Sequence, residues 1–302
     1  MVKWDMILFH ERKIMKKNVL KMGFLFAIFV FILCSCSIQK DDLEGANIYT
    51  TVYPINYLTK YLYGSYSTIN SIYPKDCDLN TFKLTSKQVK NYSEADLFIY
   101  NGLTKEKEIA KTLLNKNKNL LIIDVSYGLW TNNDSTDLWL SPKNYLMLAK
   151  NIKDNLTNYL TSKYIIEEVE KNYNDFEEKI SLMDANLRNI GSEAKDNNKN
   201  TIIASSNTLK FLNDYGFNVI SLEDNENLKE VKLNNIKNRF KNKKSTYILC
   251  LDTDKNNSVI TDLVKTSNAK LMEVDSLTLT LEDEDYFNIM TSFIENIKNV
   301  LS

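Results

Sequence analysis

The chain has 302 residues, and its 38 basic and 39 acidic side chains nearly cancel, which gives no reason to expect a nucleic-acid partner. Only 7 glycines and 3 prolines occur, which favours a regular, helix-rich domain over a disordered or fibrous chain. The single histidine, His10, lies in a segment that we expect to be removed, and this excludes Ser-His-Asp and Cys-His catalysis as well as the commonest metal ligand.

The N-terminus has the pattern of a secretory signal followed by a lipid attachment site. A basic run, Lys16 to Lys21, precedes a charge-free apolar stretch, Met22 to Leu33. An aliphatic residue stands three positions before Cys36 and a small residue directly before it, which predicts cleavage before Cys36 and a lipid on that cysteine. The alternative is a membrane-spanning helix, but a span needs ~20 apolar residues and this stretch is shorter.

This N-terminal pattern predicts the first domain boundaries and the cellular location of the protein. Residues 1–35 are the predicted signal peptide, with Met15 as an alternative start, and residues 36–46 are the lipidated N-terminus and tether. Removal of residues 1–35 leaves 32 basic and 37 acidic side chains, a mildly acidic chain. We expect an extracytoplasmic protein that is anchored by its lipid to the outer face of the cell membrane.

Short apolar strands alternate with helices in residues 47–162, the predicted N-terminal lobe. Strands are expected at Ile48 to Tyr53, Thr68 to Tyr73, Asp96 to Tyr100 and Leu120 to Asp124. Helices are expected at Ile55 to Tyr63, Ser86 to Tyr92 and Lys105 to Leu114. This alternation indicates a parallel sheet that is covered on both faces.

From Pro142 to about Glu193 apolar residues recur at three- and four-residue steps, and no proline interrupts them after Pro142. The spacing predicts one or two long helices whose apolar stripe is core, and residues 163–197 are assigned to a linking helix.

Residues 198–302, the predicted C-terminal lobe, repeat the alternation. Strands are expected at Thr201 to Ala204, Asn218 to Leu222, Thr246 to Leu251 and Lys270 to Val274. Helices are expected at Thr208 to Asp214, Glu226 to Phe240, Ser258 to Ser267 and Asp285 to Leu301. The predicted fold is α/β: two βα-alternating lobes with parallel central sheets, joined by a long rigid α-helix, with a ligand cleft between them. Ligands of such sheets bind beyond the carboxyl ends of the strands, so the loops there should face the cleft.

Several segments, in order along the mature chain, resemble the solute-binding lipoproteins of zinc and manganese ABC importers. These segments are Thr51-Val52-Tyr53-Pro54, Ala95 to Leu103 with Glu106 close behind, Trp139 to Asn144, Asp214 to Phe217 and Asp275-Ser276-Leu277. The resemblance implies a monomeric receptor that carries Zn or Mn as its transported ligand, uses no catalytic cofactor, and delivers the ion to an ABC transporter permease.

The same resemblance places four ligand positions, and the family's histidines are missing from them. Asn80 and Asp137 stand where two histidines are usual, Ser206 stands at the third position to within one residue, and Asp275 matches the fourth, an aspartate. The lipidation site is Cys36. Oxygen ligands suit manganese, magnesium or calcium better than zinc. The alternative is that Asp137 and Asp275 are ordinary solvated carboxylates, with Asp275 capping a turn.

Other patterns are weaker. Cys77 lies in the loop of Asn80 and is a candidate soft ligand, whereas Cys250 lies in an apolar run and is interpreted as a buried thiol. Asp252 and Asp254 are interpreted as a helix N-cap. The tyrosines of the first helix are interpreted as core or rim, with a stacking surface as the alternative.

Three functions remain, and the first is preferred. It is a lipid-anchored receptor for a divalent metal ion. The second is a diverged family member that has lost the metal and binds another solute or acts as a surface interaction protein. The third is an extracytoplasmic hydrolase, which the missing histidine disfavours, so we predict no enzyme and no catalytic residue.

Overall fold

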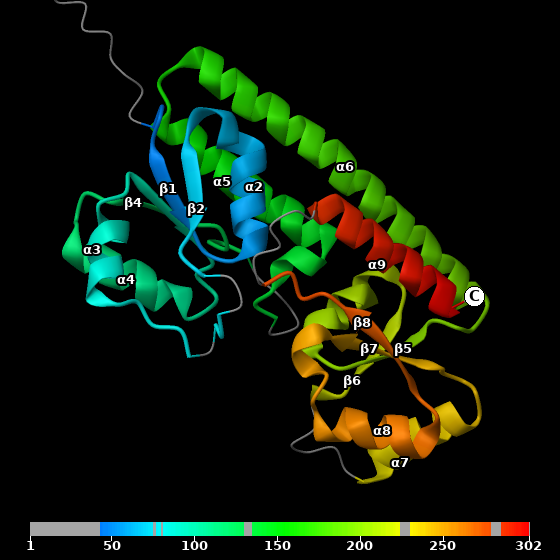
Figure 1. Cartoon of the computed structure of the whole chain (residues 1–302). Coiled ribbons are helices and arrows are strands. Elements are labelled where there is room, and N and C mark those ends of the chain that lie inside the picture. The colour runs from blue at the N-terminus through cyan, green and yellow to red at the C-terminus, as the bar shows by residue number, and fades with distance from the viewer. Residues whose placement is uncertain are drawn as a thin grey trace, which may run out of the picture. The chain divides into compact units, whose positions relative to one another are not determined.

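The computed structural model describes residues 43–74, 77–79, 81–129, 135–223, 230–278 and 285–301 (Figure 1). The chain divides into two units, Met1–Asp41 and Asp42–Ser302, and both lobes belong to the second. The predicted signal peptide, the lipid-bearing Cys36 and the ligand position Asn80 lie outside the described residues. None of the helices within the described ranges combines the length and the apolar character that are needed to span a membrane.

The first sheet has four parallel strands in the order β2-β1-β3-β4. Its strands are β1 (Asn47–Thr50), β2 (Thr68–Ser71), β3 (Leu97–Tyr100) and β4 (Leu121–Asp124). All four residues of β3 are buried, as expected for an inner strand with helices on both faces. The helices of this lobe are α2 (Tyr53–Tyr63), α3 (Ser86–Ser93) and α4 (Glu106–Lys116), with a 3₁₀ turn, η1 (Gly64–Tyr66), after α2.

The first strand is shorter than predicted because a helix begins where the strand was expected to end. β1 stops at Thr50 and α2 starts at Tyr53, with Pro54 as its second residue. Proline favours this place because its ring fixes φ near the helical value and its missing N–H is not needed there. The tyrosines of α2 are packed rather than presented to a ligand: Tyr63 is fully buried, and Tyr57 and Tyr61 contact Phe287 at 6.3 and 6.0 Å between ring centroids.

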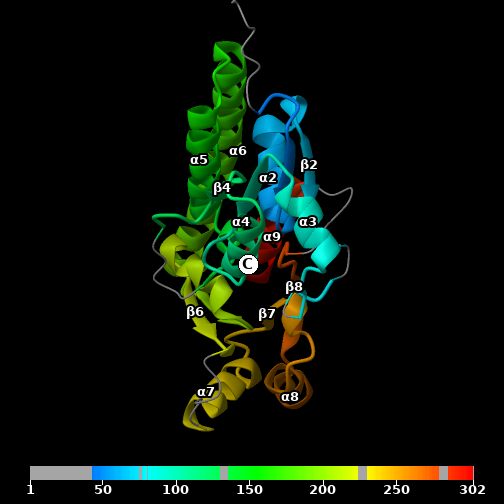
Figure 2. The same cartoon turned by 90° about the vertical axis from the view of Figure 1, so that its left-hand side faces the viewer.

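The second sheet repeats the first in order and direction. Its strands are β5 (Thr201–Ala204), β6 (Asn218–Ser221), β7 (Tyr247–Leu251) and β8 (Lys270–Val274), all parallel, in the order β6-β5-β7-β8. Between them lie η3 (Asn207–Tyr215), α7 (Glu230–Lys241), η5 (Asp252–Asp254) and α8 (Ser258–Ser267). In both views α7 and α8 lie side by side next to this sheet (Figures 1 and 2).

The long apolar stretch forms two helices, α5 (Pro142–Tyr159) and α6 (Lys163–Asp196), preceded by a 3₁₀ turn, η2 (Leu138–Leu140), and α6 lies within the predicted linking helix. Ser162 separates them, because its side chain accepts a hydrogen bond from the backbone N–H of Ile165 and so starts α6. With 34 residues, α6 is about 51 Å long at 1.5 Å per residue and passes both lobes (Figure 1). Its buried stripe includes most of the apolar residues predicted from the spacing.

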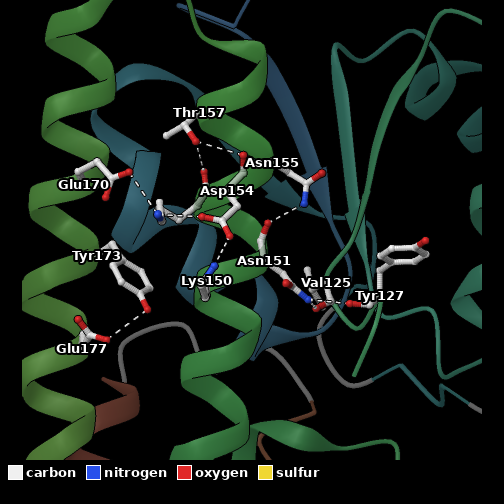
Figure 3. A network of polar contacts seen from close by, with 11 residues as sticks. Val125, Tyr127, Lys150, Asn151, Asp154, Asn155, Thr157, Glu170, Tyr173 and Glu177 are labelled. Carbon is white, nitrogen blue, oxygen red and sulfur yellow. Dashed lines mark hydrogen bonds and ion pairs between the residues drawn. The ribbon is translucent and has the colours of Figure 1, made fainter. Parts of the chain in front are cut away.

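Polar contacts join α5 to α6 and to the first sheet (Figure 3). Lys153 of α5 pairs with Glu170 of α6 at 3.2 Å. Asn151 donates from its side chain to the backbone carbonyls of Val125 and Tyr127, at 2.8 and 3.1 Å. These bonds fix the chain directly after β4, which is the start of the segment that leads to Asp137.

The last described helix, α9 (Tyr286–Leu301), and the residue before it form hydrogen bonds with elements from the first half of the chain. The Tyr57 hydroxyl of α2 donates to Asp285 at 2.7 Å, directly before α9. The Tyr286 hydroxyl donates to the Trp139 carbonyl at 2.7 Å, and the Trp139 indole N–H donates to the Ser276 carbonyl at 2.8 Å. One hydrophobic core therefore runs from the first lobe through α5, α6 and α9 into the second.

Candidate functional site

A cavity of about 940 Å³ lies between the two lobes, at the carboxyl ends of their strands. From the first lobe it is lined by residues that follow β1, β2 and β3, among them Val52, Tyr73 and Glu106. From the second lobe Thr253, Asp254 and Thr278 line it, after β7 and β8. This is the edge at which open α/β sheets bind ligands, as the sequence predicted.

Asp137, a predicted ligand, lines this cavity directly before η2. Within the described ranges it forms no ion pair with a lysine or arginine, and the Thr136 hydroxyl donates to its Oδ1 at 3.3 Å. Burial raises the pKa of the Asp137 carboxyl to about 6, the Thr136 hydrogen bond lowers it, and the negative charge of Glu223 raises it further. Asp137 is thus a largely buried carboxylate that no basic side chain of the described residues neutralises by direct ion pairing.

Glu106, in the first turn of α4, is a second acidic group in the cavity wall and is only 5% exposed. Its Oε2 accepts a hydrogen bond from the backbone N–H of Asn101 at 2.8 Å. Burial raises the pKa of Glu106 to about 7; the hydrogen bonds from Asn101 and Thr51 lower it, and the charges of Asp137 and Asp124 raise it. In the sequence, Glu106 was noted only as part of the family resemblance, five residues after Asn101. Nothing in the sequence predicted that its side chain is buried.

The Asn101-Gly102-Leu103 landmark shapes the loop that carries Glu106. A Cβ atom on Gly102 would lie 1.9 Å from Oδ2 of Asp124, so only glycine allows the close approach in which the Gly102 N–H donates to Asp124 Oδ1 at 2.9 Å. The Asn101 side chain donates to the Thr136 carbonyl at 2.8 Å, which ties this loop to the residue beside Asp137. The landmark is therefore structural and holds Glu106 and Asp137 in one wall.

Ser206, the predicted third ligand, faces a carboxylate rather than the open cavity. Its hydroxyl donates to Oε2 of Glu223 at 2.6 Å, and the side chain is 8% exposed. The hydroxyl of Ser205 donates in the same way to Oδ2 of Asp254 at 2.6 Å. Each serine therefore orients an acidic side chain, and the charge of Glu223 raises the pKa of Asp137.

Asp275, the predicted fourth ligand, lies elsewhere. It lines a separate hollow of about 380 Å³ between β8 and α9, together with Glu273 and Asp285, and it is absent from the lining of the larger cavity. Its Oδ1 accepts from the Leu277 N–H at 2.8 Å, the turn-capping contact that the sequence offered as the alternative.

The structure also bears on the predictions for the two cysteines and for Asp252 and Asp254. Cys77 lines the cavity, and burial raises the pKa of its thiol. Both Cys77 and Cys250 are free, and Cys250 is buried, as predicted. The N-cap assignment for Asp252 and Asp254 is wrong, because Asn257 caps α8. Within the described residues no group of three or more His, Cys, Asp and Glu side chains converges closely enough to hold a metal ion.

Comparison with known proteins decides the family. The family described as zinc-uptake complex component A, periplasmic (ZnuA), matches residues 48–300. The chain belongs to this family. The match confirms the resemblance that the sequence segments indicated.

Relatives in the ZnuA family carry names that describe metal-binding lipoproteins. The chain is 26% identical over 312 residues to the "Zinc-binding lipoprotein AdcA" of Streptococcus pneumoniae, with 94% of this chain and 61% of that protein covered. It is 30% identical over 199 residues to the "Manganese ABC transporter substrate-binding lipoprotein PsaA" of Streptococcus anginosus, with 58% and 64% covered. The chain thus spans about three fifths of the length of these relatives.

Solved structures of the family share the fold. The Zn(II)-bound ZnuA-like domain of Streptococcus pneumoniae AdcA superimposes with a TM-score of 0.68 at 22% identity, covering 85% of this chain and 98% of that one. The lipoprotein YcdH of Bacillus subtilis gives a TM-score of 0.69 at 20% identity, covering 85% and 100%. These likenesses confirm the predicted two-lobed α/β fold.

Proposed function

We propose that this chain is the lipid-anchored substrate-binding protein of an ABC importer, and that it captures a divalent metal ion in the cavity between its lobes. The ion is of the zinc and manganese class, and the receptor delivers it to a permease in the same membrane. The lipid on Cys36 holds the receptor at the outer face of that membrane.

The observation that carries the proposal is the pair of largely buried carboxylates in the cavity wall, which also contains Lys105. Asp137 and Glu106 both line it, and neither forms an ion pair with a basic side chain of the described residues. A carboxylate that is removed from water without a partner is costly, so such a wall favours a cationic ligand. Carboxylate oxygens are hard donors, and they suit manganese better than zinc.

A second function has a specific observation in its favour. Since no three ligating side chains of the described residues converge on one point, a member that has kept the scaffold and lost the metal is the alternative. Such a protein would bind another solute or act as a surface interaction protein.

Metal analysis and melting curves separate the two functions. Residues 36–302, produced without acylation and purified without chelator, are assayed for bound metal and melted in zinc, manganese and calcium. We expect near-stoichiometric metal and a matching rise in melting temperature, because a ligand that binds only the folded state stabilises it. Asp137→Asn should remove the rise, whereas Glu167→Gln, in an exposed pair with Lys163 on α6, should preserve it. Absence of any ion effect on the unmodified chain would favour the alternative.

The anchor has its own test. Cells that express the full chain are labelled with a radioactive fatty acid, and the label should disappear in Cys36→Ala. Retention of the label in that variant would contradict the lipidation site.

A further inference from the structure

A further hollow, of about 380 Å³, opens on the first lobe beside α3 and α4, two helices that pack against each other (Figure 1). Six apolar or aromatic side chains line it, each of them only partly buried: Tyr73, Leu79, Phe82, Leu84, Val89 and Ile109. Apolar side chains that gather at one exposed place mark a binding site, whereas single exposed ones do not. The volume of this α3–α4 hollow falls within the range of small-molecule pockets.

The walls of the α3–α4 hollow belong to packed elements of the lobe. Val89 of α3 and Ile109 of α4 both pack against the small core beneath these helices. Tyr73 and Phe82 meet edge to face, with 4.9 Å between the ring centroids and 77° between the ring planes. Aliphatic and aromatic surfaces of this kind accept a compact apolar body.

Two lysines, Lys83 and Lys105, give the α3–α4 hollow a positive rim. Within the described ranges neither of them forms an ion pair. Glu108 also lines the hollow, but it pairs with Lys111 at 3.8 Å. The hydroxyl of Thr112 donates to the backbone carbonyl of Glu108 at 2.8 Å. Of the charged side chains in the described lining, the two lysines are therefore left for a ligand, and their charge is complementary to an anion.

We propose that the α3–α4 hollow binds a small apolar carboxylate, with its apolar body against Tyr73, Phe82 and Ile109 and its carboxylate between Lys83 and Lys105. Exposed ion pairs contribute little in water, so the lysines select the charge of the ligand. Burial of the apolar body supplies most of the affinity. Aromatic and aliphatic acids share this chemistry, and a binding assay with one of each separates them.

The α3–α4 hollow shares a wall with the larger cavity, because Tyr73, Leu79 and Lys105 line both. The larger cavity is the poorer place for an acid, since Asp137 and Glu106 line it and like charges repel. The proposal goes beyond the receptor function and requires no ion in that cavity.

The test is a titration of residues 36–302 with 3-phenylpropanoate and with octanoate, in the presence of a chelator and followed by methyl NMR. We expect saturable binding with a dissociation constant of about 1 mM or below, the affinity that ligands with about ten non-hydrogen atoms reach. The methyl signals of Leu84 and Val89, which line only the α3–α4 hollow, should shift. Those of Val52 and Leu103, which line only the larger cavity, should stay in place.

Charge variants test the role of the two lysines. Lys83→Gln should weaken binding about two- to fivefold, and the double variant Lys83→Gln with Lys105→Gln about tenfold, as expected for exposed charge partners. Lys107→Gln is the matched control, because Lys107 is exposed in the first turn of α4 and lines neither hollow. The neutral amides of the two acids keep the apolar body, and they should bind the unmodified chain about as weakly as the acids bind the double variant.

The outcomes separate the parts of the proposal. Absence of saturable binding for both acids would overturn the site, and so would shifts confined to Val52 and Leu103. Equal affinity for acid and amide, or an equal loss in Lys83→Gln and Lys107→Gln, would overturn the assignment of the carboxylate. Tighter binding of 3-phenylpropanoate supports an aromatic ligand, and tighter binding of octanoate supports an aliphatic one. The receptor function stands apart from all of these results, because metal analysis tests it separately.

Discussion

Gly191 of α6 offers a sharp test of how the linking helix meets the second lobe. A Cβ atom there would lie 1.8 Å from the backbone oxygen of Tyr215, the last residue of η3. No side-chain rotation relieves a contact with backbone, so Gly191→Ala must displace η3 from α6.

The size of the effect follows from two opposing contributions. Overpacking costs about 1–3 kcal/mol, and the upper end, about 3 kcal/mol, applies because the neighbour is backbone. Alanine is favoured over glycine inside a helix by up to about 1 kcal/mol, which offsets part of the cost. The expected net loss is about 2 kcal/mol of unfolding free energy, or a fall of about 4–8 °C in melting temperature for a domain of this size.

Thermal and urea unfolding of residues 36–302 measure this loss, and Gly64→Ala is the matched control. Gly64 has helical dihedral angles, and an added Cβ would meet only the Lys60 side chain, at 3.6 Å. That control should be neutral or gain about 0.4–1 kcal/mol from the stiffer unfolded chain. A Gly191→Ala protein that melts at or above the unmodified temperature would refute the described contact between α6 and η3.

Two further predictions concern buried polar groups. Because the pKa of Glu106 rises from 4.5 to about 7 on folding, the metal-free folded state holds its proton more tightly than the unfolded chain does, and the stability this supplies is lost as the pH rises from about 5 to 7. Urea midpoints measured across that window should fall with pH, and Glu106→Gln should flatten the fall; an unchanged slope in the variant would assign the effect to other groups. Tyr286→Phe removes the donor to the buried Trp139 carbonyl and should cost about 1–3 kcal/mol, whereas Tyr247→Phe, which loses no hydrogen bond of the described residues, should cost little. Equal unfolding free energies for these two variants would contradict the first assignment.

The fold was predictable because its signals are local. The strands are short apolar runs between polar segments, and both α8 and β8 have the bounds that the sequence predicted. The first strand is an error, because α2 already begins at Tyr53 where the strand was expected to continue. The linking helix is not, since α6 spans Lys163–Asp196, close to the predicted residues 163–197. The 3₁₀ turn η2 has three consecutive buried residues, Leu138 to Leu140, which no helical or strand period distinguishes.

The site was less predictable because it depends on contacts between distant segments. Asp137 was found through its place before the Trp139-Leu140 pair, and it does line the cavity. Glu223 carries no motif, and only the hydrogen bonds from Ser206 and Asn207 reveal its orientation. Asp275 matched a sequence landmark, yet the turn that follows β8 directs it into another hollow. The order of elements along the chain therefore predicted which loops lie near the cavity. Only the tertiary packing shows which side chains of those loops line it.

The position of α9 has a consequence for the order in which the molecule forms during synthesis. Tyr57, near the start of the first lobe, donates to Asp285, 228 residues later, and Phe287 packs on Phe176 at 5.5 Å between ring centroids. The aromatic surface of α2 and α6 therefore stays uncovered until α9 emerges, although the strands of the first lobe are complete long before. A chain that stopped before α9 would present this surface to proteases and to other unfinished chains.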